Sequence, residues 1–195
     1  MRGREVYSKI RPAIILCSGL ARILPWFLRY LIFVFLRHAP TKCGIAFRYI
    51  LLRTLLKKAG ENIAVFDGVY LFAPAKMTIG NHVSIHEMCY IDASGGLTIG
   101  NEVAIAHNVT IMTTSHDYEQ VGYIKDAQCC MASVEIGNDV WIGAGVRVLA
   151  GVHIGNHVVI GAGSVVNRSI PENSLAVGVP AKVIRSLQPK DRTFS

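Results

Sequence analysis

The fold is decided by residues 136–166, which read IGNDVWIGAGVRVLAGVHIGNHVVIGAGSVV. A branched aliphatic residue stands at every sixth position of this stretch, at Ile136, Ile142, Val148, Ile154, Ile160 and Val166. A period of six is neither that of a helix nor the simple alternation of a strand. It is typical of a parallel β-helix, in which each coil buries its aliphatic side chains only by stacking on the neighbouring coils.

The same frame continues upstream with a displacement of two residues. Ile79, Ile85, Ile91 and Leu97 keep one register, and Ile99, Ile105 and Ile111 keep a second. We interpret the displacement as a small bulge at residues 94–96, where Ser-Gly-Gly favours a turn. A sandwich of short strands is the alternative, but sandwich strands do not keep a strict hexad over many units. We therefore predict a mainly β protein whose residues 61–185 form a parallel β-helix.

Four segments carry a resemblance to a known family: CYIDAS at 89–94, TTSHDY at 113–118, NDVWIGAG at 138–145 and GVPAKVI at 178–184. They resemble the hexapeptide-repeat acyltransferases, which include maltose, galactoside, serine and polysaccharide O-acetyltransferases. The resemblance covers residues 60–185. It implies a left-handed β-helix, acetyl-CoA as the acyl donor, and a homotrimer with its sites between subunits.

Residues 1–60 differ in composition from the rest of the chain. They hold 12 of the 20 basic residues and one of the 13 acidic residues, so their net charge is +11. Their longest uncharged apolar run, 30–36, is much shorter than the ~20 residues that span a bilayer. We predict basic amphipathic helices that lie on an anionic membrane surface. The alternative is that these helices pack on the β-helix or on one another.

This distribution of charge also bears on partners and location. Because the basic residues are concentrated in 1–60, we expect no nucleic-acid partner. The five cysteines are odd in number and have no framework spacing, which favours a reducing compartment. Neither a CxxC pair nor an HExxH motif occurs, so we expect no metal. Together these features predict a bacterial cytoplasmic protein, peripheral on the inner face of the cytoplasmic membrane, with residues 186–195 as a C-terminal tail.

The hexads stop after Ile111 and resume at 134–136, so residues 117–133 are predicted to form a loop excursion. His116 stands at its start. Histidine ionises near neutral pH and suits the general base that an attacking hydroxyl requires. A lone loop histidine is more often a solvated surface residue, but by resemblance His116 matches the catalytic histidine of the family, which deprotonates an acceptor for direct attack on acetyl-CoA.

Other candidates follow from the same resemblance. Trp141 matches a tryptophan beside the acceptor, and the alternative is that it covers a trimer interface. His86, Asp92 and Asp117 are predicted to bind the acceptor, although Asp92 also fits a corner residue that bonds its own backbone. The residues predicted to bind coenzyme A are Gly143, Ala144, Gly161, Ala162, Asn167, Arg168, Lys182 and Arg185. The basic members suit its phosphates, with solvated surface charge as the alternative.

The favoured function is thus an acetyl-CoA-dependent O-acetyltransferase acting on a sugar hydroxyl in cell-surface polysaccharide biosynthesis, such as capsule, O-antigen or exopolysaccharide. Three alternatives remain. One is acetyl transfer to a small acceptor, as in serine O-acetyltransferases. Another is a metal enzyme like the γ-type carbonic anhydrases, for which the seven histidines lack the expected ligand pattern. The last is a β-helix scaffold without catalysis.

Overall fold

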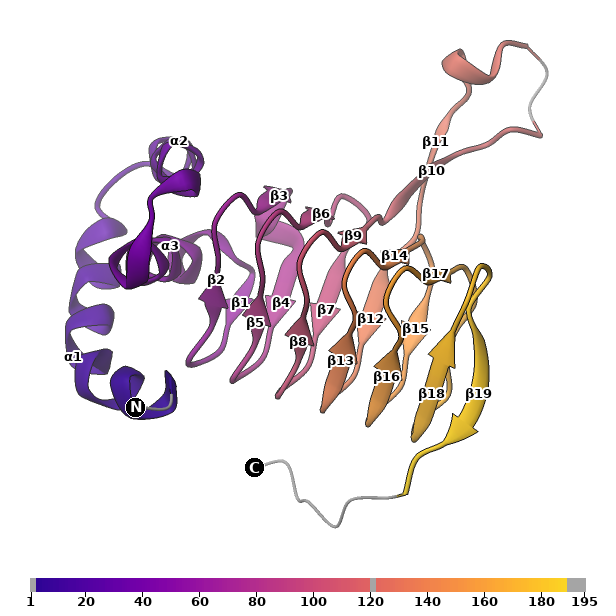
Figure 1. Cartoon of the computed structure of the whole chain (residues 1–195). Coiled ribbons are helices and arrows are strands. Elements are labelled where there is room, and N and C mark those ends of the chain that lie inside the picture. The colour runs from indigo at the N-terminus through magenta and orange to yellow at the C-terminus, as the bar shows by residue number, and fades with distance from the viewer. Residues whose placement is uncertain (1–2, 120–121, 189–195) are drawn as a thin grey trace.

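The computed structural model describes residues 3–119 and 122–188. Short strands wind into a solenoid of about six coils with three faces, each of which is a parallel sheet (Figure 1). The parallel β-helix predicted from the hexad is therefore confirmed. In each coil the chain passes through sheet A, sheet B and sheet C in that order, so the A–B, B–C and C–A corners recur along the solenoid.

The strands of each sheet are two to five residues long. Sheet A contains β1 (Lys58–Ala59), β4 (Met77–Ile79), β7 (Leu97–Ile99), β12 (Val134–Ile136) and β15 (His153–Ile154). Sheet B contains β2 (Ala64–Val65), β5 (Ser84–Ile85), β8 (Ala104–Ile105), β13 (Val140–Ile142), β16 (Val158–Ile160), β18 (Ser174–Val177) and the antiparallel β19 (Lys182–Ser186). Sheet C contains β3 (Tyr70–Phe72), β6 (Tyr90–Asp92), β9 (Thr110–Ile111), β14 (Arg147–Val148) and β17 (Val165–Val166). Residues 189–195 of the predicted tail lie outside the described residues.

The hexad aliphatics form buried ladders inside the solenoid. In sheet A the strand register places Ile79, Ile99, Ile136 and Ile154 directly on one another, and all four are buried. Burying one such side chain contributes about 1.5–3 kcal/mol. The ladders therefore supply the main driving force for stacking the coils.

The C–A corner varies in length, whereas the strands on either side keep their register. Thr78 and its partner Thr98 are 20 residues apart, but Glu135 and its partner His153 are 18 apart. The longer coils place a 3-10 turn, η2 (Pro74–Lys76), or the 94–96 turn at this corner, where the Gly96 N–H donates to Ala93 O. The displacement seen in the sequence therefore lies where the bulge was predicted.

In the third coil the C–A corner carries a long arm. β10 (Thr114–His116) and β11 (Cys129–Met131) pair antiparallel and extend away from the solenoid, with η3 (Ile124–Asp126) near the tip (Figure 1). The predicted excursion began at residue 117, but the arm begins three residues earlier, at Thr114. The reason is that 114–116 pair with 129–131 and not with a neighbouring coil.

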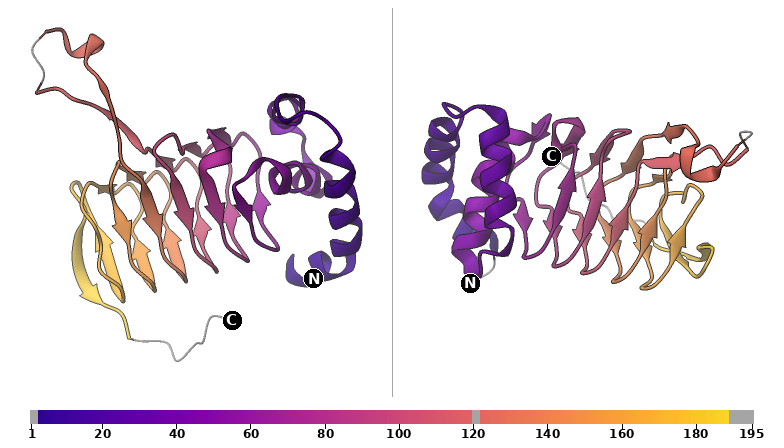
Figure 2. Two further views of the ribbon diagram at one scale, coloured as in Figure 1. Left: turned by 180° about the vertical axis from the view of Figure 1, so that it is seen from behind. Right: turned by 90° about the horizontal axis from the view of Figure 1, so that it is seen from above.

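Three helices lie across one end of the solenoid: α1 (Gly3–Ala21), α2 (Trp26–Phe35) and α3 (Thr41–Leu55), with η1 (Leu36–His38) between the last two (Figure 2). The predicted helical N-terminal segment is thus confirmed. Within the described residues, none of the helices is long and apolar enough to cross a membrane. α3 buries Tyr49, Leu51, Leu52 and Leu55, so it closes the apolar end of the first coil.

Arg48 fastens this helical cap to the first coil. Its side chain is buried, with Nε donating to Val65 O at 2.8 Å and Nη1 donating to Ala39 O at 2.8 Å and Leu36 O at 3.1 Å. Burial lowers its pKa, although arginine stays charged at any physiological pH. One guanidinium thus joins α3, the end of η1 and strand β2.

Candidate active site

The proposed base, His116, lies on the arm and not on the solenoid. It is the last residue of β10, its imidazole is exposed, and it pairs across the arm with Cys129. The Nδ1 atom lies 3.4 Å from Ala127 O. In the tautomer in which Nδ1–H donates to this carbonyl, Nε2 is free to accept a proton.

The base of the arm is fixed by Asp92, at the end of β6. The Thr114 hydroxyl donates to Oδ2 of Asp92 at 2.8 Å, and the Ser94 N–H donates to Oδ1 at 2.9 Å. Burial raises the pKa of the Asp92 carboxyl, but the hydrogen bonds from Ser94 and Thr114 outweigh it, so the pKa is lowered. Asp92 is 8% exposed, and both of its oxygens are occupied within the chain.

The structure therefore gives Asp92 a part in holding the arm. Its predicted contact with the acceptor stays a prediction. Two residues that support it, Ser94 and Thr114, were not among the sequence candidates. They lie in the CYIDAS and TTSHDY segments that carried the family resemblance, which was the available signal.

Asp117 organises the chain just beyond His116. Its N–H donates to Gln128 O at 3.0 Å, and its Oδ1 accepts from the Glu119 N–H at 3.2 Å. The carboxylate thus stabilises a turn that leads out of β10, as an aspartate commonly does. Asp117 lies next to His116 on the arm, as the sequence requires, and its contact with an acceptor stays a prediction.

A second group of candidates lies along the B–C corner. His86, Gly143 and Gly161 occupy equivalent places in their coils, since each N–H donates to a sheet B carbonyl of the next coil, and Ala106 takes this place in the coil between His86 and Gly143. The glycines let these coils approach closely. A Cβ built on Gly143 would lie 2.6 Å from the Ala162 nitrogen, and one on Gly161 would lie 2.6 Å from Cγ1 of Val177. Ala144 and Ala162 follow them, so the corner presents a row of small residues.

Two aromatic features border this row. Trp141 points outward from the middle of β13 and is 52% exposed, beside Ala104 and Val159 on the neighbouring strands. His86 stacks on Phe66 with ring centroids 4.5 Å apart. The row of small residues therefore lies beside Trp141 on the surface, and its contact with coenzyme A stays a prediction.

The basic candidates are divided between two places. Asn167 and Arg168 follow β17 and are exposed at the C–A corner. Lys182 and Arg185 are exposed on β19, opposite Val177 and Leu175 of sheet B. Lys182 is therefore near the small-residue row at the B–C corner, whereas Arg168 is separated from it by sheet C.

His116 and Trp141 are not brought together within one chain. The arm leaves from the C–A corner, and β13, which carries the exposed Trp141, belongs to sheet B on another side of the solenoid (Figure 1). One copy of the chain therefore displays two half-sites: the arm with His116 and Asp117, and the B–C corner with Trp141 and the small-residue row.

Metal ligation finds no support in the part of the chain that the structure describes, where no group of three or more His, Cys, Asp and Glu side chains is arranged to hold an ion. Several histidines have other partners. His157 Nδ1 lies 2.7 Å from Asp139 Oδ2, and His153 Nδ1 lies 3.3 Å from Glu135 Oε2.

Comparisons with known proteins agree with this fold. Residues 133–168 match the family model described as bacterial transferase hexapeptide (six repeats). The chain is 34% identical over 147 residues to the galactoside O-acetyltransferase of Escherichia coli (strain K12), covering 75% of this chain and 72% of that protein. A solved galactoside acetyltransferase in complex with coenzyme A superimposes with a TM-score of 0.73 at 31% identity, covering 86% of this chain and 87% of that chain. A maltose O-acetyltransferase from Clostridium difficile 630 gives a TM-score of 0.72 at 28% identity, covering 95% of this chain and 90% of that chain.

Proposed function

The chain belongs to the hexapeptide-repeat acyltransferase family, and from that premise we propose that it transfers the acetyl group of acetyl-CoA to a sugar hydroxyl, with His116 as the general base. The enzyme class is that of an O-acetyltransferase using acetyl-CoA, as its relatives are named. The observation that carries the proposal is the exposed His116 imidazole on an arm whose base is fixed by the hydrogen bonds of Asp92.

The reaction follows from the placement of His116. Nε2 takes the proton of the sugar hydroxyl as its oxygen attacks the thioester carbonyl carbon. The tetrahedral intermediate then collapses, the C–S bond breaks, and the imidazolium returns the proton to the leaving coenzyme A sulfur. Because Ala144 offers no hydroxyl, the oxyanion depends on a backbone N–H of the B–C corner for stabilisation.

We assign the donor to the B–C corner. Gly143, Ala144, Gly161 and Ala162 leave room for the pantetheine arm, and Lys182 and Arg185 on β19 carry positive charge toward its phosphates. In a symmetric trimer, the C–A corner of a neighbouring copy would face the coenzyme A bound at this B–C corner. Asn167 and Arg168 of that neighbouring copy would then contact the nucleotide end.

The two half-sites support a homotrimer as the active form. His116 lies on the arm, and Trp141 lies on a different face of the same chain. A threefold assembly would bring the arm of one copy against the B–C corner and sheet B of the next, so each site would use both halves. In that assembly Trp141, His86, Asp92 and Asp117 are the side chains proposed to meet the acceptor.

For the acceptor we propose a sugar unit of a cell-surface polysaccharide, modified at the inner face of the bacterial cytoplasmic membrane. The support is the apolar surface of α1 and α2. Phe27 and Phe35 of α2 and Ile23 of the turn between α1 and α2 are 67–79% exposed, and they belong to a strongly basic segment. Exposed aromatic and aliphatic side chains with nearby cations suit an anionic lipid surface, where lipid-linked glycans are assembled.

The decisive first experiment is acetyl-CoA binding by calorimetry, followed by acetyl transfer to a panel of sugars. We expect one micromolar, salt-sensitive site per subunit. His116→Ala should bind acetyl-CoA normally but lose on the order of 10²-fold or more in turnover. His153→Ala is the matched control, since His153 lies on sheet A and pairs with Glu135. Equal turnover in His116→Ala and the wild type would remove His116 as the base.

The membrane proposal has its own test. The pair Phe27→Ser and Phe35→Ser should abolish sedimentation with phosphatidylglycerol vesicles, because both rings are exposed and their loss does not disturb a core. Phe47→Ser, on the exposed side of α3, is the control for loss of a surface phenylalanine. Unchanged vesicle binding in the double variant would argue against insertion of α2. Truncation is a poor test, because α3 closes the solenoid.

A further inference from the structure

An apolar cavity of about 390 Å³ lies between the first half of α1, α3 and the first coil of the solenoid. Its volume falls in the ~300–1,000 Å³ range of small-molecule pockets. The walls are mainly hydrocarbon, and the residues that matter here are Ile10 and Ile14 of α1, Ile45 and Ala46 of α3, and Ile63 and Phe66 of the first coil. The cavity is distant from the arm, and none of the B–C corner candidates lines it. One of its lining residues, Phe66, stacks on the candidate His86.

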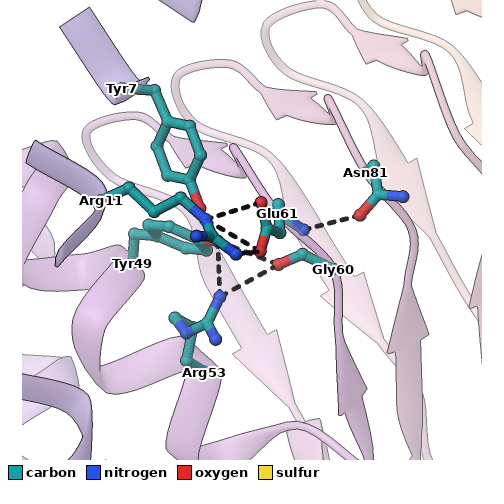
Figure 3. Close-up of polar contacts among 7 residues, drawn as sticks. All are labelled: Tyr7, Arg11, Tyr49, Arg53, Gly60, Glu61 and Asn81. Carbon is teal, nitrogen blue, oxygen red and sulfur yellow. Dashed lines mark hydrogen bonds and ion pairs between the residues drawn. The ribbon is translucent and has the colours of Figure 1, made fainter. Parts of the chain in front are cut away.

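The first half of α1 crosses this space without filling it. Polar contacts hold it in place (Figure 3). Arg11 forms a bidentate ion pair with Glu61, with Nε 2.9 Å and 3.0 Å from the two carboxylate oxygens, and the Tyr7 hydroxyl lies 3.4 Å from that of Tyr49. On α1 Ile14 is buried in the core, whereas Ile10 lines the cavity and is 39% exposed. The helix therefore covers an apolar space that its own apolar side chains do not fill.

The charge of the residues that line the cavity limits the kind of ligand that it can bind. Of the described residues that line the cavity, Lys42 is the one with a charged side chain, and none is acidic. The other polar groups are already engaged within the chain. The Tyr49 hydroxyl donates to Gly60 O at 2.9 Å, and Asn62 Nδ2 lies 3.0 Å from His82 Nδ1. The cavity therefore offers hydrocarbon walls and a single ammonium group to a ligand.

We propose that this cavity binds the hydrocarbon chain of an anionic amphiphile, with its headgroup beside Lys42. A long-chain carboxylate and a single-chain lipid phosphate share this chemistry. Binding would stabilise the packing of α1 against the solenoid, because the hydrocarbon chain fills the space between them. The site is independent of acetyl transfer and does not require the proposed function.

The test uses the full-length protein and alkyl sulfates of six to twelve carbons, kept below their critical micelle concentrations, with calorimetry as the readout. Each methylene that enters an apolar site contributes ~0.8 kcal/mol, so Kd should fall about fourfold per added carbon until the cavity is full. The matching alcohols, which lack the charge, should bind more weakly. A Kd that does not depend on chain length would overturn the proposal.

Two variants with matched controls locate the site. Ile10→Trp should fill the cavity and abolish binding, whereas Ile15→Trp, on the same helix but outside the lining, should bind as the wild type does. Lys42→Gln should weaken the sulfates about two- to fivefold and leave the alcohols unchanged, with Lys57→Gln as the control. Circular dichroism shows whether Ile10→Trp is folded. If it is not folded, the result for Lys42→Gln decides whether the cavity is the binding site. Unaltered sulfate binding in a folded Ile10→Trp, or in Lys42→Gln, would refute the site.

A last comparison identifies the natural source. Decanoate and a lysophosphatidylglycerol of equal chain length should both bind if the cavity accepts the shared chemistry. Preference for decanoate indicates a free fatty acid, and preference for the lysolipid indicates a membrane lipid. Failure of both, with acetyl-CoA binding intact, would overturn the inference while leaving the acetyltransferase assignment in place.

Discussion

The hydrogen bond between Thr114 and Asp92 joins the start of the arm to the solenoid, and removing it should loosen the arm without unfolding the protein. The Thr114 hydroxyl donates to Oδ2 of Asp92 at 2.8 Å, where the carboxylate is almost fully buried. Thr114→Val keeps the branched shape and removes the donor. Thr114→Ser keeps the donor and is the matched control.

The magnitude follows from the chemistry of this bond. A hydrogen bond to a charged group is worth ~1.5–3 kcal/mol, and its loss leaves a carboxylate oxygen buried without that partner. About 1.4 kcal/mol corresponds to a tenfold change in an equilibrium constant. The equilibrium constant for opening of the arm should therefore rise roughly 10- to 150-fold. If His116 depends on this bond for its position, kcat/KM should fall by a similar factor.

Hydrogen exchange read by mass spectrometry measures the opening without a known acceptor. Peptides that cover residues 113–119 and 127–132 should exchange faster in Thr114→Val, while peptides from sheets A and B should not change. The direction in which protection of the arm changes with pH also follows. The Asp92 pKa is lowered in the folded protein, so its contribution is present above the unfolded value of ~3.9 and is lost as pH falls through the folded value. Arm protection should therefore decline in acid, and less so in Thr114→Val. Equal exchange of the arm in Thr114→Val and Thr114→Ser would refute the reasoning.

Three further predictions concern stability and reactivity. Arg48→Met should lower the free energy of unfolding by about 3 kcal/mol in urea titration, because four backbone carbonyls lose the charged donor of a buried side chain. Gly19→Ala should raise it by ~0.5–1 kcal/mol in the same assay, since an added Cβ meets nothing within 4 Å and alanine favours the helix. Alkylation of the native protein by iodoacetamide should label four of the five cysteines by intact mass, sparing Cys89 because burial raises the pKa of its thiol to about 11. Labelling of all five at the rate of the unfolded chain would contradict the last of these.

The repeat was predictable because its period reports directly on burial. An aliphatic at every sixth position points inward in this fold, and Ile99, Ile105, Ile136 and Ile154 are all buried as the hexad requires. Even the two-residue displacement was informative, because it falls at a corner where an extra turn leaves the strand register intact. These features depend on local spacing, which is visible in one sequence.

The helical segment was harder to interpret because composition does not say which apolar side chains are covered. Phe33 is 1% exposed and Phe35, two residues later on α2, is 77% exposed. Leu52 and Leu55 on α3 close the solenoid, whereas Phe27 faces outward. Packing on the β-helix therefore describes α3, whereas the membrane interpretation stays a proposal about the outer faces of α1 and α2.

The candidate site was predictable as a list of residues but not as an arrangement. The resemblance suggested that Asp92 contacts the acceptor, with a corner residue that bonds its own backbone as the alternative, and in the structure its oxygens accept hydrogen bonds from Ser94 and Thr114. The separation of His116 from Trp141 also depends on where the arm leaves the solenoid, and an antiparallel pairing of 114–116 with 129–131 has no hexad to reveal it.

The position of the arm has a physical reason in the other corners. At the A–B corner the side chains of Asn81, Asn101, Asn138 and Asn156 form a ladder, each Oδ1 accepting a backbone N–H from the coil before it at 2.7–2.8 Å. An insertion there would break bonds to two neighbouring coils. The B–C corner is constrained by close stacking of glycines such as Gly143. The C–A corner already contains η2 in one coil and the 94–96 turn in another, and the strands on either side keep their register. It is therefore the corner at which an arm can be added at least cost to the fold.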